Sequence, residues 1–299
     1  MAHSNGDGAT VADTAGEPKL ERVPVDQDVS LSVRVWESAA GLDRTPFVLL
    51  HGIASTAVAW DGVARRLATA GRTACAIDFR GHGLSDRPDH GYDVATLGSD
   101  VAAAVAGLRL ERPILVGHSL GAWVILEALA GRRVMAGGAG LVEGGLVDAS
   151  DQFATLEECL AKLALPPVAG MPLARLQGYL RHANPAWSDA RLEAALAAFD
   201  VRDDGTVAWR LTQPRQEALL RAMWAARVSD WWPAVQVPAV VAVADTGDAP
   251  WTAAKRAADA DIRRAVPGVR VEWLNADHDI HADRPDWVAD LLLGAFDGV

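Results

Sequence analysis

Gly117-His118-Ser119-Leu120-Gly121 is a pentapeptide with glycine two residues before and two residues after a serine. It follows a short apolar run, Ile114-Leu115-Val116, and it opens a segment of helical period from Leu120 to Ala130. In a sharp strand-to-helix turn, residues two before and two after the central one approach so closely that side chains there would clash. Glycine at both places relieves the clash, so the pattern predicts such a turn with Ser119 at its tip.

The predicted turn also suits a particular chemistry. A helix that begins directly after a serine presents unpaired N–H groups beside the hydroxyl, where an oxyanion forms during acyl transfer. The N–H of Leu120 is the expected donor. A serine hydroxyl is a poor nucleophile at neutral pH, so this chemistry also needs an adjacent base, usually a histidine that a carboxylate holds in place.

Strand and helix signals alternate along the rest of the chain. Short unbroken apolar runs, as expected for strands buried on both faces of a parallel sheet, occur at 47–50, 73–77, 114–116 and 240–243. Segments of helical period separate these runs, and alternating stretches at 20–25 and 29–36 suggest a strand pair at one sheet edge. This order predicts an α/β fold with a mostly parallel, doubly wound sheet.

One long segment interrupts the alternation. From 150 to 233 we find helix signals separated by turn residues and no clear strand, which predicts an inserted helical cap. Thr155, Ser188 and Thr212 are the expected helix caps, and Asp203-Asp204-Gly205-Thr206 is interpreted as a turn between the last two helices. The predicted organisation is a flexible tail at 1–19, a core domain formed by 20–149 and 234–299, and the cap at 150–233.

Two further motifs follow buried strands. His51-Gly52-Ile53 comes after one strand, and Asp78-Phe79-Arg80-Gly81-His82-Gly83-Leu84-Ser85 comes after the next. With the turn at Ser119, they make the chain resemble the α/β-hydrolase superfamily from about Leu20 to Phe296. The resemblance implies the α/β-hydrolase fold and places a second oxyanion-hole N–H at Ile53, beside that of Leu120. We expect His51 and His82 to position loops and to transfer no proton.

The candidate base lies near the C-terminus. Of eight histidines, His278 and His281 follow the last predicted strand, at 269–274. In the superfamily, the catalytic histidine follows that strand and precedes a final helix begun by a proline. The stretch His278-Asp279-Ile280-His281-Ala282-Asp283-Arg284-Pro285 resembles this motif, so His278 takes the catalytic place and His281 is interpreted as a structural partner.

The acid that would hold His278 has three candidates. The strand at 240–243 ends in Ala244-Asp245-Thr246-Gly247-Asp248, and the spacing usual in the superfamily favours Asp248. Asp245 is an alternative that could instead cap the next helix. Glu143 is a second alternative. It ends the strand that precedes the one at 240–243, and some superfamily members carry the acid at that place. The chain order of serine, acid and histidine suits the fold.

Composition excludes several classes of function. The chain has 299 residues, half of them hydrophobic, and a formal net charge of -11, so nucleic acid and anionic membrane surfaces should repel it. No apolar run is long enough to span a bilayer, no secretory signal is visible, and the two cysteines lie far apart. We therefore expect a cytoplasmic protein, and both a monomer and a homodimer stay open. The sequence lacks phosphate, zinc and dinucleotide motifs, so we expect no cofactor and no metal.

The motifs together predict a serine hydrolase that cleaves an ester, lactone or thioester of a hydrophobic small molecule through an acyl-enzyme. Acyl transfer, carbon–carbon bond hydrolysis or lyase chemistry by the same triad is one alternative. A ligand-binding or receptor protein with slow turnover is another. We expect one or two aromatic residues of the cap to face an apolar substrate pocket, from the set Phe153, Tyr179, Trp187, Trp209, Trp224, Trp231 and Trp232.

Overall fold

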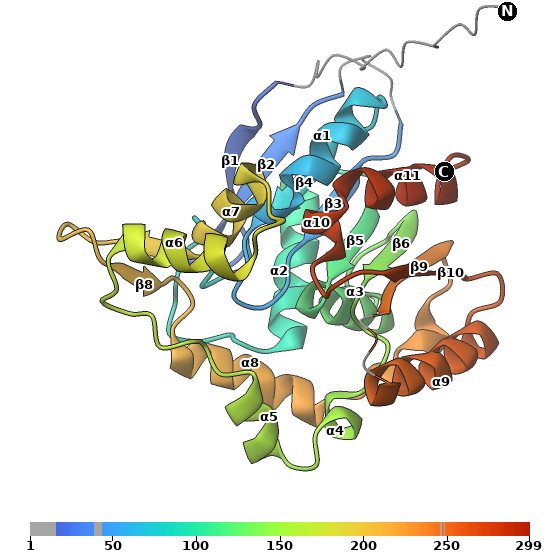
Figure 1. The fold of residues 1–299 in the computed structure, drawn as a ribbon. Coiled ribbons are helices and arrows are strands. Elements are labelled where there is room, and N and C mark those ends of the chain that lie inside the picture. The colour runs from blue at the N-terminus through green and yellow to red at the C-terminus, as the bar shows by residue number, and fades with distance from the viewer. Residues whose placement is uncertain (1–15, 39–43, 246, 248) are drawn as a thin grey trace, which may run out of the picture.

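An eight-stranded sheet forms the centre of the computed structural model, which describes residues 16–38, 44–245, 247 and 249–299 (Figure 1). The strand order is β1-β2-β4-β3-β5-β6-β9-β10. β2 pairs antiparallel with β1 and β4, and the pairings from β4 through β10 are parallel, which confirms the predicted mostly parallel sheet. The strands are β1 (Lys19–Pro24), β2 (Ser30–Trp36), β3 (Phe47–Leu50), β4 (Ala74–Ile77), β5 (Ile114–His118), β6 (Gly138–Val142), β9 (Ala239–Asp245) and β10 (Arg270–Asn275).

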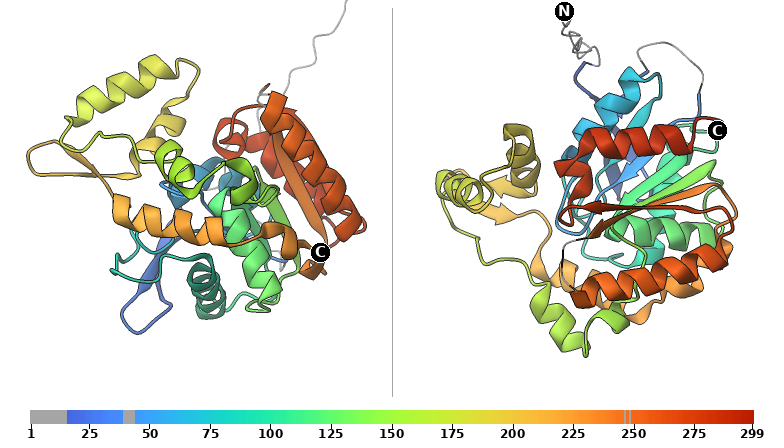
Figure 2. Two further views of the ribbon diagram at one scale, coloured as in Figure 1. Left: turned by 90° about the horizontal axis from the view of Figure 1, so that it is seen from below. Right: turned by 45° about the vertical axis from the view of Figure 1, so that its right-hand side comes forward.

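Helices cover both faces of this sheet, as a doubly wound fold requires (Figures 1 and 2). Alternate residues of the buried strands point to opposite faces, so Val48 and Leu50 belong to one hydrophobic cluster and Phe47 and Leu49 to another. The first cluster packs against α2 (Val94–Gly107), α3 (Leu120–Ala130) and α9 (Ala249–Ala265). The second packs against α1 (Asp61–Thr69) and α11 (Pro285–Ala295), with α10 (Ile280–Asp283) and the 3-10 helix η1 (Ala57–Trp60) beside them.

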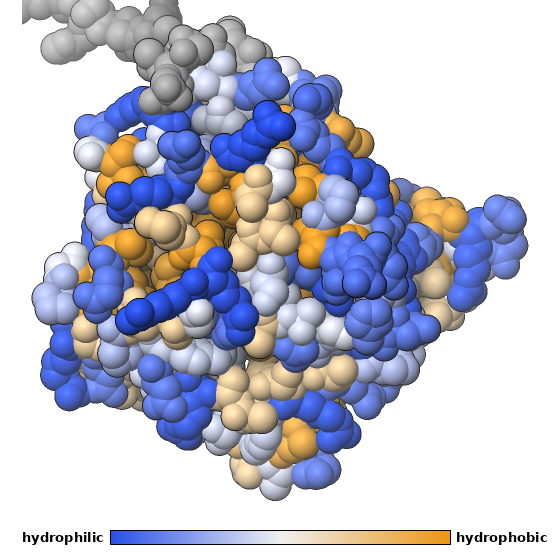
Figure 3. Space-filling model, turned by 180° about the vertical axis from the view of Figure 1, so that it is seen from behind, coloured by the Kyte–Doolittle hydropathy of each residue, from blue (hydrophilic) through white to orange (hydrophobic). Residues whose placement is uncertain are grey.

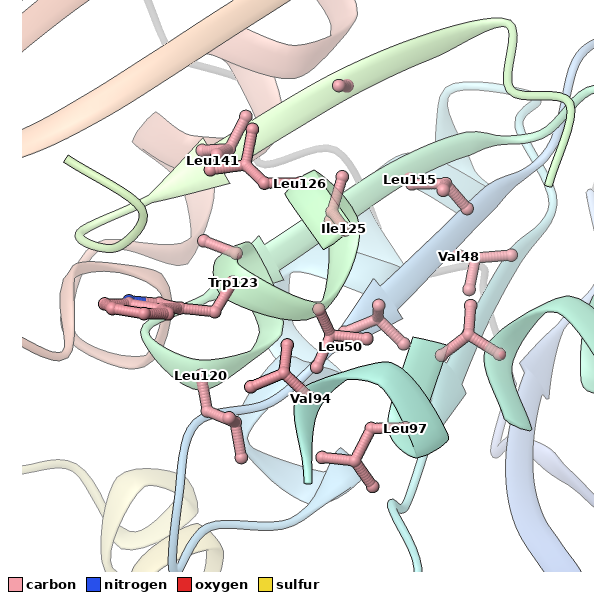
Figure 4. Packing of buried hydrophobic residues seen from close by; sticks show 14 of the residues in the cluster. Val48, Leu50, Val94, Leu97, Leu115, Leu120, Trp123, Ile125, Leu126 and Leu141 are labelled. Atoms are coloured by element: carbon pink, nitrogen blue, oxygen red, sulfur yellow. The ribbon is translucent and has the colours of Figure 1, made fainter. Parts of the chain in front are cut away.

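The central strands are continuous apolar runs because both of their faces are covered. In Figure 4, Leu115 of β5 and Leu141 of β6 lie among side chains of α3 such as Ile125 and Leu126. All five residues of β5 and all five of β6 are buried. The carboxyl ends of these two strands are therefore fixed in position by packing on both sides.

The segment that connects β6 to β9 holds the elements that the sequence assigns to a cap, and we call residues 149–234 the insertion. Its helices begin at α4 (Ala149–Gln152) and continue with α5 (Leu156–Lys162), α6 (Leu173–Ala183), α7 (Asp189–Leu196) and α8 (Gln213–Ala225), followed by the 3-10 helices η2 (Val228–Asp230) and η3 (Trp232–Ala234). In Figure 2, α6 and α7 stand away from the sheet. Two of the predicted caps use their side chains, since Thr155 accepts from the Glu158 N–H and Ser188 from the Arg191 N–H, whereas Thr212 makes no such bond.

The expectation of an insertion without strands is wrong. β7 (Phe199–Val201) and β8 (Val207–Trp209) form an antiparallel hairpin, and the turn at 203–206 closes this hairpin and does not join two helices. Phe199 stacks on Trp209 across the hairpin with ring centroids 4.1 Å apart. Strands of three residues are too short to show a period of two, so the sequence pattern does not reveal this hairpin. The aromatic pair that stabilises it forms only when the two strands come together.

Among the helices that the structure describes, none is long and apolar enough to cross a membrane. Figure 3 shows hydrophobic areas interspersed with hydrophilic residues on the face opposite that of Figure 1. Cys75 and Cys159 are both free and buried, as expected from their separation. Of the predicted tail, residues 1–15 lie outside the described part of the chain, and Lys19 already begins β1.

Candidate active site

Ser119 lies at the junction of β5 and α3, in the sharp turn that the sequence predicts. Its φ of 50° and ψ of -113° are a strained conformation for a residue with a side chain. A Cβ at Gly117 would overlap the backbone of Gly121, and a Cβ at Gly121 would overlap the Leu50 carbonyl. A Cβ at Gly144 would lie 2.5 Å from the Ser119 carbonyl oxygen. At each of these three positions a side chain would overlap neighbouring backbone, so glycine is required there.

The two predicted oxyanion-hole residues lie on either side of this turn. Leu120 is the first residue of α3, so its N–H is one of the four that have no acceptor within the helix. The loop after β3 comes close to the serine, because a Cβ at Gly52 would lie 3.2 Å from the Ser119 Cβ. Ile53, the next residue, lines the same cavity as Ser119. The structure thus brings both residues to the nucleophile turn.

His51 and His82 hold loops, as expected. The His51 Nε2 accepts a hydrogen bond of 3.0 Å from the Phe79 N–H, and its ring lies 4.9 Å from that of His82. Burial lowers the pKa of His51 to about 4 and that of His82 to about 3, so both imidazoles are neutral at pH 7. The buried Asp78 accepts from the N–H groups of Ala57 and Leu84 and ties the same loops together.

The two C-terminal histidines have different surroundings. His278 follows β10, has a half-exposed side chain and lines the cavity beside Ser119. The His118 Nε2 donates to the His278 carbonyl oxygen over 3.0 Å, which anchors the backbone of this loop on the residue before the serine. His281 is 1% exposed and stacks between Trp60 and His118, with centroid distances of 4.4 and 4.2 Å. Burial lowers its pKa well below the ordinary value, so His281 serves packing.

Glu143 is the carboxylate that approaches His278. It directly follows β6, is 6% exposed and has a φ of 47°. Its Oε1 lies 3.7 Å from the His278 Nδ1, and its Oε2 accepts from the Ala244 N–H over 2.7 Å. The same Oε1 bonds to the ammonium of Lys255. Burial raises the pKa of Glu143, but His278, Lys255 and the Ala244 N–H together outweigh it, so the pKa is lowered.

The other two acid candidates have different positions. Asp245, the last residue of β9, accepts from the Gly247 N–H over 3.2 Å and from the Thr252 hydroxyl over 3.0 Å, and these bonds lower its pKa. It therefore organises the loop that enters α9, as the sequence analysis allowed. Asp248 lies outside the described residues. Of the two candidates that the structure describes, Glu143 is the one beside His278.

A cavity of about 690 Å³ opens beside Ser119 and His278. Apolar side chains of the insertion form much of its wall. Of the seven aromatic residues considered above, four line it, more than the one or two expected: Phe153, Tyr179, Trp187 and Trp209. Trp232 is instead buried against the core, where its indole N–H donates to the Gly145 carbonyl.

Arg191 is a cavity residue that the sequence analysis missed. It lies on α7, is 8% exposed, and bonds to Asp279 over 2.5 Å and to Asp283 over 3.0 Å. Its guanidinium also stacks 4.1 Å from the centre of the Trp187 ring. Burial raises the pKa of Asp279, but His118, Arg191 and His278 lower it more. No local pattern marks this ion pair, because its partners are about ninety residues apart in the chain.

Two groups of described side chains have the composition of a metal site: an exposed one formed by Asp26, Asp28 and His90, and one beside the candidate active site. His118, Asp279 and His281 bring three potential ligand atoms within 4.8 Å of one another. The guanidinium of Arg191 already binds an oxygen of this aspartate, so a metal cation there would lie close to a fixed positive charge.

Comparisons with known proteins bear on the family and the fold of this chain. The profile described as "Alpha/beta hydrolase family" matches residues 47–291. The chain is 38% identical over 112 residues to 2-(acetamidomethylene)succinate hydrolase of Mesorhizobium japonicum. That alignment covers 37% of this chain and 38% of the relative, so the chain spans less than two fifths of the relative's length.

Two solved structures are similar over almost their whole length. The crystal structure of E-2-(acetamidomethylene)succinate hydrolase superposes with a TM-score of 0.76 at 22% identity and covers 94% of this chain and 100% of that chain. A thioesterase domain from the curacin biosynthetic pathway gives a TM-score of 0.70 at 22% identity, with 93% and 100% covered. At these identities the superpositions establish the fold.

The chain belongs to the α/β hydrolase family, and it is an enzyme of that family. The expected family and fold class are therefore confirmed.

Proposed function

We propose that the chain is a serine hydrolase that cleaves an ester, lactone or thioester of a hydrophobic small molecule. The observation that carries the proposal is the strained Ser119 in a glycine-lined turn, in the same cavity as His278. Backbone strain at a strand-to-helix turn of this kind is found where the chemistry needs an exposed hydroxyl. The carboxylate of Glu143 behind His278 completes a nucleophile, base and acid arrangement.

In the proposed reaction, His278 takes the hydroxyl proton of Ser119 while the serine oxygen attacks the substrate carbonyl. The N–H groups of Leu120 and Ile53 bind the resulting oxyanion. His278 then gives the proton to the leaving alcohol or thiol, and an acyl-enzyme remains. Water, deprotonated by His278, attacks this acyl group, and the proton returns to Ser119 as the acid product leaves.

We assign the role of the acid to Glu143, in preference to Asp245 and Asp248. Its Oε1 is 3.7 Å from the His278 Nδ1, and catalytic hydrogen bonds tighten in reacting complexes. The carboxylate orients the imidazole and stabilises its protonated form. Asp245 uses one of its oxygens to hold the loop before α9. For Asp248, the role of the acid remains a prediction from the sequence.

The cavity supports a hydrophobic and uncharged substrate. Its wall includes aromatic and aliphatic side chains from the insertion, which favour apolar groups. Its two cationic residues are already paired: Arg191 with Asp279 and Asp283, and Lys255 with Glu143. A substrate carboxylate would have to compete with these ion pairs, so neutral esters should be better substrates than anionic ones.

A serine-directed fluorophosphonate tests the nucleophile. Wild type should be labelled, and Ser119→Ala should not. Ser99→Ala, in which an α2 serine that bonds to the Ala95 carbonyl is replaced, is the control and should label normally. Turnover of neutral esters, lactones and thioesters of graded chain length, with a succinate monoester as the anionic comparison, should disappear with Ser119→Ala. Unchanged labelling or turnover in Ser119→Ala would overturn the proposal.

A further inference from the structure

Lys255 is a buried cation at the candidate acid, and no sequence motif points to it. It lies on α9, is 8% exposed and lines the cavity. Its ammonium bonds to Glu143 Oε1 and, over 3.0 Å, to the Ala244 carbonyl oxygen. A buried ammonium is costly unless carboxylate and carbonyl partners replace its water, and here both kinds of partner are present.

The other cations of α9 are unlike Lys255. Arg256, the next residue, has a side chain that is 57% exposed and lies 3.7 Å from Asp245, and its guanidinium stacks on Trp273. Arg263 and Arg264 have side chains that are 49% and 76% exposed and pair with carboxylates of their own helix. Solvated pairs of this kind contribute little. Among the described α9 cations, Lys255 alone reaches the end of β6.

The contacts fix the Glu143 carboxylate from two directions. The Ala244 N–H binds Oε2, and the Ala244 carbonyl binds the ammonium that in turn binds Oε1. One residue of β9 therefore positions both the carboxylate and its cation. The same Oε1 lies 3.7 Å from the His278 Nδ1. This arrangement limits the carboxylate to an orientation in which it faces the imidazole.

We propose that Lys255 is a positioning residue of the triad, which holds Glu143 ionised and directed at His278. The inference rests on the proposed function, because it assigns Lys255 a role through Glu143 and His278. Lys255 lies on α9, whereas the nucleophile, base and acid all follow strands.

The charge of Lys255 also has a consequence for pH dependence. The ammonium is one of the contacts that lower the pKa of Glu143, so its loss favours protonation of this carboxylate. The other charged or titratable groups around this pair are His278, Asp279, which is paired with Arg191, and the buried His118 and His281. A protonated carboxyl group can no longer stabilise a charged imidazole, so the acid limb of the pH–rate profile moves to higher pH.

Three variants test the proposal on a neutral ester that the wild type hydrolyses. Lys255→Met keeps the length of the side chain and removes the charge. We expect kcat to fall about 10- to 100-fold with KM changed by no more than about threefold, because orientation at the reacting groups is lost and substrate contacts are kept. The acid limb of kcat/KM should move to higher pH. Lys255→Arg should restore the acid limb, and the matched control Arg256→Met should behave as wild type.

A double variant keeps the test decisive if Lys255→Met does not fold. In a Glu143→Gln background, adding Lys255→Met should change kcat by less than about twofold, because Lys255 acts through the carboxylate. A further large loss there, or a wild-type kcat and acid limb in the single variant, would overturn the proposal. Turnover that persists in Ser119→Ala would instead refute the proposed function, so the two failures are distinguishable.

Discussion

The end of β6 and the end of β9 carry the two described carboxylates that could serve His278, and their environments differ. Glu143 is buried, faces the imidazole and is held by a buried lysine. Asp245 has a side chain that is 36% exposed, and its pairing with Arg256 is a solvated contact of 3.7 Å. The two cations are neighbours on α9. A carboxylate that follows a parallel strand therefore becomes an active-site candidate through the direction of its side chain and not through its place in the motif.

The largest expected effect comes from neutralising each carboxylate. Glu143→Gln should lower kcat/KM by about 10³- to 10⁴-fold, because loss of the orienting carboxylate leaves the imidazole in the wrong tautomer. Asp245→Asn should stay within about threefold of wild type, since the amide oxygen can still accept from Gly247 and Thr252. Steady-state kinetics on one neutral ester measures both.

Asp248→Asn completes this experiment. The sequence-based spacing favours Asp248, and the structure does not describe that residue. If Asp248→Asn lowers kcat/KM by more than about 10³-fold while Glu143→Gln keeps most of its activity, the acid lies on the loop after β9 and not at the end of β6.

The stability of the two sites should also differ. Removing one partner of a buried ion pair costs about 3–5 kcal/mol, so Glu143→Gln should lower the free energy of unfolding by about that amount at pH 7. The pKa of Glu143 is lowered by folding, so its contribution is complete above its ordinary value of 4.5 and is lost as the pH falls through the folded value. The difference between wild type and Glu143→Gln should therefore shrink below pH 4.5.

Denaturant unfolding at pH 7 and at pH 3.5 measures this difference. Asp245→Asn is the matched variant at the β9 end and should differ little from wild type at either pH. An equal gap between wild type and Glu143→Gln at the two pH values would mean that the Glu143 carboxylate does not contribute to stability through its charge.

A third contact supports the candidate base from the insertion. Arg191 holds Asp279, the residue next to His278, and in this way connects α7 to the loop after β10. We expect Arg191→Met to lower kcat/KM about 10- to 100-fold, because the loop that carries His278 loses one of its anchors. Arg181→Met is the control, since its pair with Asp189 is exposed. Equal rates in the two variants would mean that the insertion does not position His278.

The sequence predicts those parts of the site that local structure determines. The turn at Ser119 is visible because backbone crowding requires glycine two residues away on both sides, and the strand ends are visible because buried strands are unbroken apolar runs. The preference for Asp248 over Glu143 follows motif spacing, whereas the contact with His278 depends on where the Glu143 side chain points, and the φ of Glu143 is itself positive. Arg191 and Lys255 act across about ninety and more than one hundred residues, respectively, which no window can relate.

The smallest expected effect tests the loop at the β9 end. Thr252 donates from α9 to Asp245, so Thr252→Ala removes one of the bonds that keep this carboxylate directed at its own loop. Since the contact is partly solvated, Tm should fall by no more than about 2–4 °C, and kcat/KM should be unchanged. Thermal unfolding followed by circular dichroism and the ester assay measure the two quantities. A large loss of activity with little change in Tm would show that the β9 loop acts on the reaction, and it would weaken the assignment of the acid to β6.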